Sequence, residues 1–263
     1  AGWESTLDAV WRDLRYAARA LRASPAFTAI PVLALALGIG ANTAVFSVMN
    51  AIMMRPLPVE PPGELVSLRV IYGNSVDPVF SYPAYRQFAD EGRPVIDPIA
   101  ASNVDIVVIA IDGTPDSVRQ KRVSGNYFTT LGVRAVAGRT LLTSDDRLPQ
   151  GEPVAVLSDA YWASRFGRDP SVLGRTFRLN AMTFTIVGVA PPGFFGETVG
   201  DSPDIWTPLT TQRAPAWVWS GHSTTWLRVL ARMRPAITLE QARAGLDPVY
   251  RRIREDVAAA QDR

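Results

Sequence analysis

The sequence has 263 residues, of which 47 % are hydrophobic and 20 % are charged, and its formal net charge is +2. A net charge this small gives no strong field for nucleic acid, so we expect no nucleic-acid partner. The absence of cysteine excludes disulfide, thiolate and cysteine-zinc chemistry. With His222 as the only histidine, a site with several histidine ligands is excluded within one chain. Lys121 is the only lysine, which we interpret as a compositional preference for arginine.

The first segment, residues 1–23, has the pattern of an amphipathic helix. One helical face carries apolar residues, and an adjoining face carries arginines. This pattern is typical of a helix that lies at a membrane surface with its cations near anionic headgroups. An ordinary surface helix on a soluble core is the alternative. The apolar face holds Leu7, Val10, Trp11, Leu14, Ala18 and Leu21, and the basic face holds Arg12, Arg15, Arg19 and Arg22.

The next segment, residues 24–55, contains no charged residue until its end, because none occurs between Arg22 and Arg55. Its stretch "LGIGANT" contains G-x-G-x-x-T, which is close to a dinucleotide-binding fingerprint. That fingerprint works only where a short strand ends and a helix begins. Here both glycines lie inside one apolar run that is longer than the roughly 20 residues needed to cross a bilayer. The sequence therefore predicts a transmembrane helix, with a kink near Pro31.

The flanks of this helix predict its orientation. Four arginines precede it, whereas only Arg55 and Arg69 follow soon after. By the positive-inside rule, the N-terminus is cytoplasmic and the residues after Met54 lie outside the cytoplasm. A cleaved signal peptide is less consistent with the sequence, because the apolar run is too long and no A-x-A site closes it.

Small and hydroxyl-bearing residues recur along the predicted helix at steps of four and three. Such a stripe lets another helix approach closely in lipid. We therefore expect this face to pack against further membrane helices, although the general abundance of glycine and alanine in membrane helices is an alternative explanation. The expected helix-packing face consists of Ala36, Gly40, Thr43, Ser47 and Asn50.

Residues 56–263 are expected to form one α+β domain that follows a proline-rich connection, "RPLPVEPPGE". The expected helices cover residues 81–92, 126–133 and 158–167, the last capped by Ser158 or Asp159. A final helix begins at Thr238 with a capping box to Gln241. Its apolar stripe is Leu239, Ala242, Leu246, Val249, Ile253 and Val257. Strands are expected at 64–71, 101–113, 116–125, 153–157, 204–209 and 224–235, with a hairpin at 175–192; the turns are placed at Gly113-Thr114-Pro115 and Asn180-Ala181.

The sequence contains no recognisable catalytic pattern. The carboxylates form no recognisable acid/base pair by spacing, and Asp145-Asp146 is interpreted as a solvated loop or a cap. His222 lies in "WSGHST", which has no nucleophile-elbow pattern, and is interpreted as a loop histidine without a role. The loop "APPGFFGE" is interpreted as a packed loop, or alternatively as an interaction tip formed by Phe194 and Phe195. No phosphate-binding loop of the G-x-x-x-x-G-K-[ST] type occurs.

Four blocks of the sequence resemble a known family in the same order. Residues 13–58, "DLRYAARALRASPAF…MMRPLP", resemble the N-terminus of FtsX-like ABC-type permeases, and more narrowly the duplicated orphan permeases of Acidobacteria and related soil bacteria. The blocks "RVSGNYFTTLGVRAVAGRTLLTSDD", "PVAVLSDAYWASRFGRDPSVLGRTFRLN" and "FTIVGVAPPGFFG" are similar to the MacB-like periplasmic core domain of those proteins.

The resemblance implies a non-enzymatic permease subunit. It implies one membrane helix and then a periplasmic domain with an α+β, porter-like part and a smaller β-rich part, with further membrane helices beyond this chain. Such a domain couples ATP hydrolysis by a separate cytoplasmic ATPase to work in the periplasm. The family offers no catalytic, cofactor or metal residue to carry over. The alternatives are a membrane-tethered binding or scaffold module that is not coupled to ATP, and an anchored periplasmic hydrolase.

Overall fold

The computed structural model describes residues 11–12, 15–16, 19, 25–53, 64–72, 75–198 and 200–261. The chain divides into two compact units, Ala1–Arg55 and Pro56–Arg263. The proline-rich connection expected at residues 55–64 lies outside the described residues except for Glu64.

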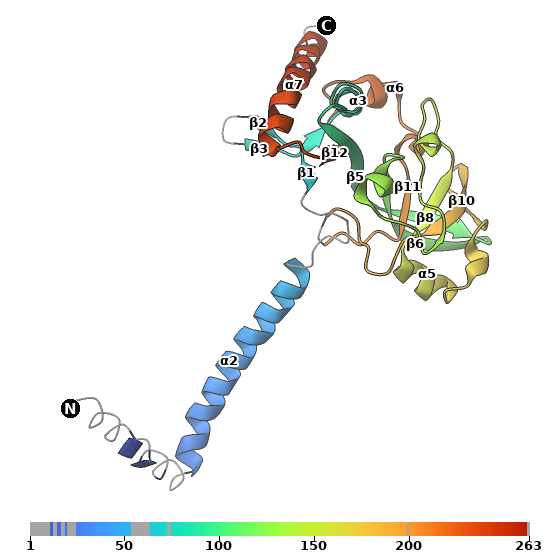
Figure 1. Ribbon diagram of the computed structural model, residues 1–263. Coiled ribbons are helices and arrows are strands. Elements are labelled where there is room, and N and C mark those ends of the chain that lie inside the picture. Colours follow the sequence, from blue (N-terminus) through green and yellow to red (C-terminus); the bar gives the residue numbers. More distant parts are fainter. Residues whose placement is uncertain are drawn as a thin grey trace. The chain divides into compact units, whose positions relative to one another are not determined.

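The first unit contains α2 (Pro25–Met53), a continuous helix of 29 residues that passes through Pro31 (Figure 1). Its central segment Thr28–Ser47 has 20 residues, a mean hydropathy of 1.9 and no buried residue. At 1.5 Å per residue this segment is about 30 Å long, which matches the hydrocarbon core of a bilayer. The two glycines of "LGIGANT" lie inside this helix rather than at a strand-to-helix turn, so the dinucleotide alternative fails for geometric reasons.

The amphipathic helix predicted for residues 1–23 is described at only a few positions. Trp11, Arg12, Arg15, Tyr16 and Arg19 are helical and exposed. The remaining residues of that segment, Arg22 among them, lie outside the described residues.

The second unit is built on a mixed ten-stranded sheet. Its main strand order is β1-β12-β5-β6-β11-β8-β10-β7, with β4 beside β12 and β9 beside both β10 and β5. β11 runs parallel to β6, and β10 runs parallel to β8. The strands are β1 (Leu65–Ser67), β4 (Val79–Phe80), β5 (Ile96–Ile111), β6 (Thr114–Val123), β7 (Ala137–Gly138), β8 (Val154–Leu157), β9 (Thr176–Leu179), β10 (Met182–Val189), β11 (Ile205–Pro208) and β12 (Leu227–Met233).

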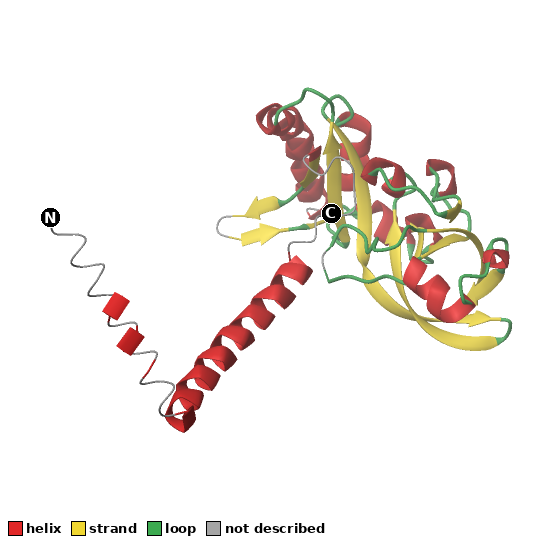
Figure 2. Ribbon diagram, turned by 60° about the horizontal axis from the view of Figure 1, so that its bottom comes forward, coloured by secondary structure: helices red, strands yellow, loops and turns green. Residues whose placement is uncertain are grey.

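Helices pack on this sheet, and Figure 2 shows them in red against the yellow strands. A separate two-stranded sheet consists of β2 (Val70–Tyr72) and β3 (Ser75–Asp77). The helices are α3 (Tyr82–Glu91), α4 (Tyr127–Leu131), α5 (Asp159–Phe166), α6 (Ala216–Ser220) and α7 (Leu239–Gln261), and the 3-10 turns are η2 (Thr143–Asp145), η3 (Pro170–Val172) and η4 (Leu209–Thr211).

The long strand β5 joins two parts of the domain. Its first residues pair with β12, next to α3 and α7, whereas its last residues pair with β6 and β9. The register of the β5–β6 pair shifts between Ala101 and Val104, which is where a bulge bends a strand. The mixed α+β class expected from the sequence is confirmed, and its helical and β-rich parts share this strand.

The caps expected from the sequence are present. Ser158 Oγ accepts from the backbone N–H of Tyr161 at 3.1 Å, so Ser158 rather than Asp159 caps α5. Thr238 Oγ1 accepts from Gln241 N at 3.2 Å, and Gln241 Oε1 accepts from Thr238 N at 2.9 Å. This reciprocal pair is the predicted capping box. Asn180 has a φ of 56° and takes the left-handed position in the β9–β10 turn.

Three local expectations were wrong. The β5–β6 turn is centred on Asp112 and Gly113, with φ of 50° and 80°, and Thr114 already belongs to β6. An Asp-Gly pair satisfies the two positive φ values of a tight hairpin, so it takes the turn. The strand expected at 64–71 is divided between β1 and β2, because the chain leaves β12 after Leu68, whose N–H still donates to Val229 O at 2.9 Å.

The third correction concerns the apolar stripe of α7. Ala242, Val249 and Ile253 are buried against the sheet and α3, as expected, but Leu239 is 65 % exposed. Leu239 is the first residue of the helix and lines an open cavity together with Ala242 and Leu246.

Candidate functional site

The residues proposed for helix packing lie on α2. Ala36, Gly40, Thr43 and Ser47 are all exposed, and a Cβ placed on Gly40 would meet nothing within 4 Å. The side chain of Asn50 lies outside what the structure describes. Among the described residues the face therefore has no partner, and its role in packing against other membrane helices stays a prediction. Arg12, Arg15 and Arg19 are exposed, and their role at the membrane surface also stays a prediction.

The pair Asp145-Asp146 is structural: the solvated-loop interpretation was wrong, and the cap alternative is confirmed for Asp145, whose side chain accepts from the N-cap residue of η2. Asp145 is 4 % exposed, pairs with Arg139 at 2.6 Å and accepts from Leu142 N at 2.8 Å. Asp146 Oδ1 accepts from the N–H and the hydroxyl of Thr210 at 2.8 and 2.7 Å. Burial raises the pKa of Asp146, and these hydrogen bonds oppose the rise. Among the described residues no group of three or more His, Asp or Glu is placed to hold a metal ion.

The loop between β10 and β11 packs inward, which excludes Phe194 as an exposed tip. Phe194 is 5 % exposed and lies 5.3 Å from Trp206 and 5.7 Å from Phe128 between ring centroids. Tyr127 completes this aromatic cluster. Gly196 has a φ of +94°, and a Cβ there would lie 3.1 Å from Tyr127 Oη, so glycine lets the loop approach the tyrosine.

A buried polar cluster forms where this loop crosses the sheet. Lys121 Nζ lies 2.5 Å from Glu197 Oε1 and 2.8 Å from Asp201 Oδ2. The hydroxyl of Tyr127 donates to Glu197 Oε2. The side chains of Lys121 and Glu197 are each 1 % exposed, while that of Asp201 is 27 % exposed.

The sheet places Lys121 at the centre of this cluster. Lys121 lies on β6, between β5 and β11, and its register partner on β11 is Trp206. Side chains alternate along a strand, so Lys121 shares a face with Val123, which packs in the aromatic cluster. The loop that leads into β11 brings Glu197 and Asp201 over that face, and α4 supplies Tyr127.

The cluster is a satisfied ion-pair network rather than a reactive group. Burial and the neighbouring Glu197 carboxylate raise the pKa of Tyr127 well above its usual value, so this phenol stays protonated. The lysine has two carboxylate partners, which compensate part of its desolvation. The cluster ties the β10–β11 loop to the central strand.

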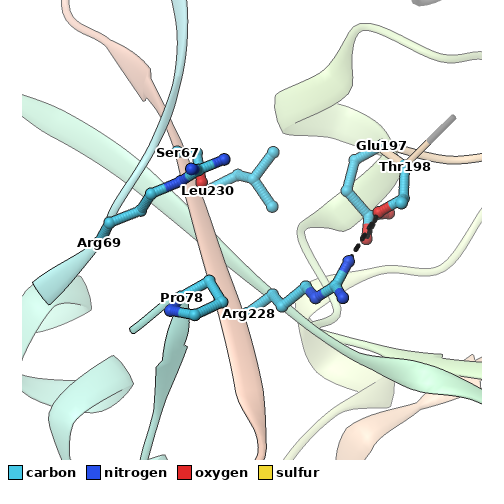
Figure 3. A pocket seen from close by; sticks show the side chains of 7 residues that line it. All are labelled: Ser67, Arg69, Pro78, Glu197, Thr198, Arg228 and Leu230. Carbon is cyan, nitrogen blue, oxygen red and sulfur yellow. Dashed lines mark hydrogen bonds between the residues drawn. The ribbon is translucent and has the colours of Figure 1, made fainter. Parts of the chain in front are cut away.

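An open cavity of about 370 Å³ lies directly beside this cluster (Figure 3). Glu197 and Thr198 form one wall, and Arg228, from β12, donates to Thr198 Oγ1 at 3.4 Å. Arg69, in the segment that connects β1 to β2, also lines the cavity, and its side chain is exposed. The remaining lining residues are Ser67, Pro78 and Leu230.

Sequence reasoning missed both the cluster and the cavity. Lys121 was interpreted as composition, and His222, which is half-buried in the loop before β12, lies in neither. One signal was available: a lone lysine within a strand that pairs on both sides has to find carboxylates when buried. The partners of Lys121 could not be identified from the sequence, because Asp201, for example, is 80 residues away in the chain.

Comparison with known proteins identifies the family. The sequence profile of the MacB-like periplasmic core domain matches residues 28–249. This chain belongs to the MacB-like periplasmic core domain family. The match begins inside α2 and continues through the sheet into α7, so it spans both compact units. No curated protein matches the chain significantly.

Solved structures of similar fold carry related descriptions. A domain of a putative permease protein from Porphyromonas gingivalis is 17 % identical, with a TM-score of 0.52 over 72 % of this chain and 83 % of that one. The periplasmic region of MacB from Actinobacillus actinomycetemcomitans is 14 % identical, with a TM-score of 0.49 over 66 % and 74 % of the two chains. The extracellular domain of the noncanonic ABC-type transporter YknZ from Gram-positive bacteria is 12 % identical, with a TM-score of 0.49 over 73 % and 94 %. At this identity the likeness to the permease domain concerns the fold alone.

Proposed function

We propose that this MacB-like chain is a non-enzymatic permease component of an ABC-type export or mechanotransmission system. In this proposal α2 spans the bacterial inner membrane with its N-terminus in the cytoplasm, and the domain of residues 64–261 lies in the periplasm. Its partners are the lipid bilayer, the other membrane helices of the permease and a separate cytoplasmic ATPase. The observation that carries the proposal is the family match over residues 28–249, which joins the apolar helix to the sheet domain.

The domain would couple movement of the membrane helix to work in the periplasm. Coupling of this kind requires two arrangements of similar free energy, one of which a partner state favours. The proline-rich connection at residues 55–64 is suited to transmit such movement, because each proline fixes φ and restricts the residue before it. A stiff connection transmits a rotation better than a Gly/Ser coil does.

The test is to replace Pro56, Pro58, Pro61 and Pro62 with serine. The full-length permease is reconstituted in liposomes with its cytoplasmic ATPase, and ATPase rate and export are measured together. We expect folding and insertion to be retained while export per ATP falls. Pro170→Ser, at the exposed start of η3, is the control and should leave the ratio unchanged.

Unchanged export per ATP in the four-proline variant would contradict transmission through this connection. A wild-type chain that never stimulates the ATPase would favour the alternative, a membrane-tethered periplasmic binding or scaffold module that is not coupled to ATP. That alternative fits the orphan permeases that the sequence resembles.

A further inference from the structure

The cavity beside the lysine cluster has more positive charge than its own carboxylates neutralise. Two cations, Arg228 and Arg69, and one carboxylate, Glu197, line the cavity, and the adjoining cluster adds Lys121 and Asp201. Both carboxylates are engaged by Lys121. Among the described residues neither arginine is within ion-pair distance of a carboxylate, in contrast to Arg232 on the same strand as Arg228, which pairs with Glu64 at 3.2 Å.

Arg228 is left with unused hydrogen-bond donors. Among the described residues, the Arg228 guanidinium makes one hydrogen bond, the long one from Nη1 to Thr198 Oγ1, which leaves its second terminal nitrogen and its buried Nε without an acceptor. A buried charged donor without a partner is costly, and native structures usually supply a partner. Figure 3 shows the Arg228 side chain directed toward Glu197 and Thr198, with the Arg69 guanidinium on the Ser67 side of the cavity.

We propose that this cavity binds a carboxylate that carries a small apolar group, as presented by a peptide C-terminus or by an acidic side chain. The two terminal nitrogens of one guanidinium form an edge that fits the two oxygens of a carboxylate. Arg69 and the hydroxyl of Ser67 are placed to support the same ligand, while Pro78 and Leu230 provide an apolar wall.

The charge of the site selects a monoanion. The excess among the named groups is a single positive charge, and Glu197 forms part of the wall. A phosphate dianion would bring two negative charges next to that carboxylate, which is unfavourable. The volume of about 370 Å³ is at the small end of ligand cavities, so it suits one residue of a peptide rather than a large substrate.

The binding test uses the full chain in neutral detergent micelles at low ionic strength, by isothermal titration. N-acetyl-leucine presents a free α-carboxylate, N-acetyl-aspartic α-amide presents only a side-chain carboxylate, and inorganic phosphate is the third probe. We expect saturable binding of at least one carboxylate. The probe that binds more tightly shows whether the ligand is a peptide C-terminus or an acidic side chain. Tighter binding of phosphate, or no saturable binding of either carboxylate, would overturn the proposal.

Two variants locate the binding. Arg228→Gln should weaken carboxylate binding roughly tenfold or more, the usual result of losing a charge-assisted hydrogen bond. Arg69→Gln should weaken it less, because Arg69 is exposed. Arg178→Gln, an equal change of charge at an exposed position of β9, should have no effect. If Arg228→Gln fails to fold, Arg69→Gln decides: binding equal to that of the wild type would contradict the site.

Discussion

Lys121 Nζ lies 2.5 Å from Glu197 Oε1, and both side chains are 1 % exposed. This ion pair fastens the β10–β11 loop to the central strand β6. A buried ion pair is stable only while both charges are present. When one charge is lost, the other stays desolvated without a partner to compensate the cost. The only lysine of the chain is therefore a position where a single change has a large effect.

Lys121→Met should destabilise the domain by about 3–5 kcal/mol, because Glu197 keeps its buried charge without its cation. Urea unfolding followed by tryptophan fluorescence measures this. Adding Glu197→Gln should recover part of the loss, since the buried charge is then removed. Arg86→Ala is the control: its pair with Asp90 is 51 % exposed on both sides, and its loss should cost no more than about 0.5 kcal/mol. A Lys121→Met variant as stable as the control would contradict the assignment.

Tyr127→Phe should destabilise the domain by about 1–3 kcal/mol at neutral pH, because Glu197 Oε2 loses its donor. The effect should shrink in alkali. The folded-state pKa of Tyr127 is raised above its usual value of 10.0 by burial and by Glu197, so the unfolded chain loses this proton at lower pH than the folded chain does.

This difference makes the stability that Tyr127 contributes decline as the pH rises above about 10. The phenylalanine variant lacks that part of the decline. Unfolding free energies of the two proteins, compared at neutral pH and just above pH 10, test the prediction. A gap between them that stays constant or widens in alkali would show that Tyr127 does not titrate as described.

Gly40→Leu should leave membrane insertion intact but weaken association with the other membrane helices. Leucine adds apolar bulk on the face where close backbone approach is expected, and space at Gly40 is open in α2 itself. Val45→Leu, an exposed change outside the stripe, should be nearly neutral. Crosslinking or co-purification of the full-length protein compares the two variants. Equal effects would remove the basis for a packing face.

Local signals in the sequence were sufficient for much of the fold. The Thr238–Gln241 capping box, the Ser158 cap and the Asn180 turn each depend on residues close in the chain, and each was found as predicted. The uncharged run around Gly38 and Gly40 likewise indicated one long helix.

Long-range features were not accessible in the same way. The Lys121 cluster joins β6, α4 and the β10–β11 loop, and its members are brought together only by the parallel pairing of β11 with β6. Nothing near Glu197 in the chain shows that it will be buried. The cavity at Arg228 is likewise lined by segments that are distant in the sequence, so no local sequence pattern indicated it.

The proposed function requires residues 64–261 to lie in the periplasm and the N-terminus in the cytoplasm. Because the chain has no cysteine, Ser117→Cys at an exposed position of β6 and Arg15→Cys before α2 each give a single thiol. In cells with a permeabilised outer membrane, a maleimide that cannot cross the inner membrane should label Ser117→Cys, and should label Arg15→Cys only after lysis. Labelling of Arg15→Cys in intact cells with protection of Ser117→Cys would contradict the proposed orientation and the function built on it.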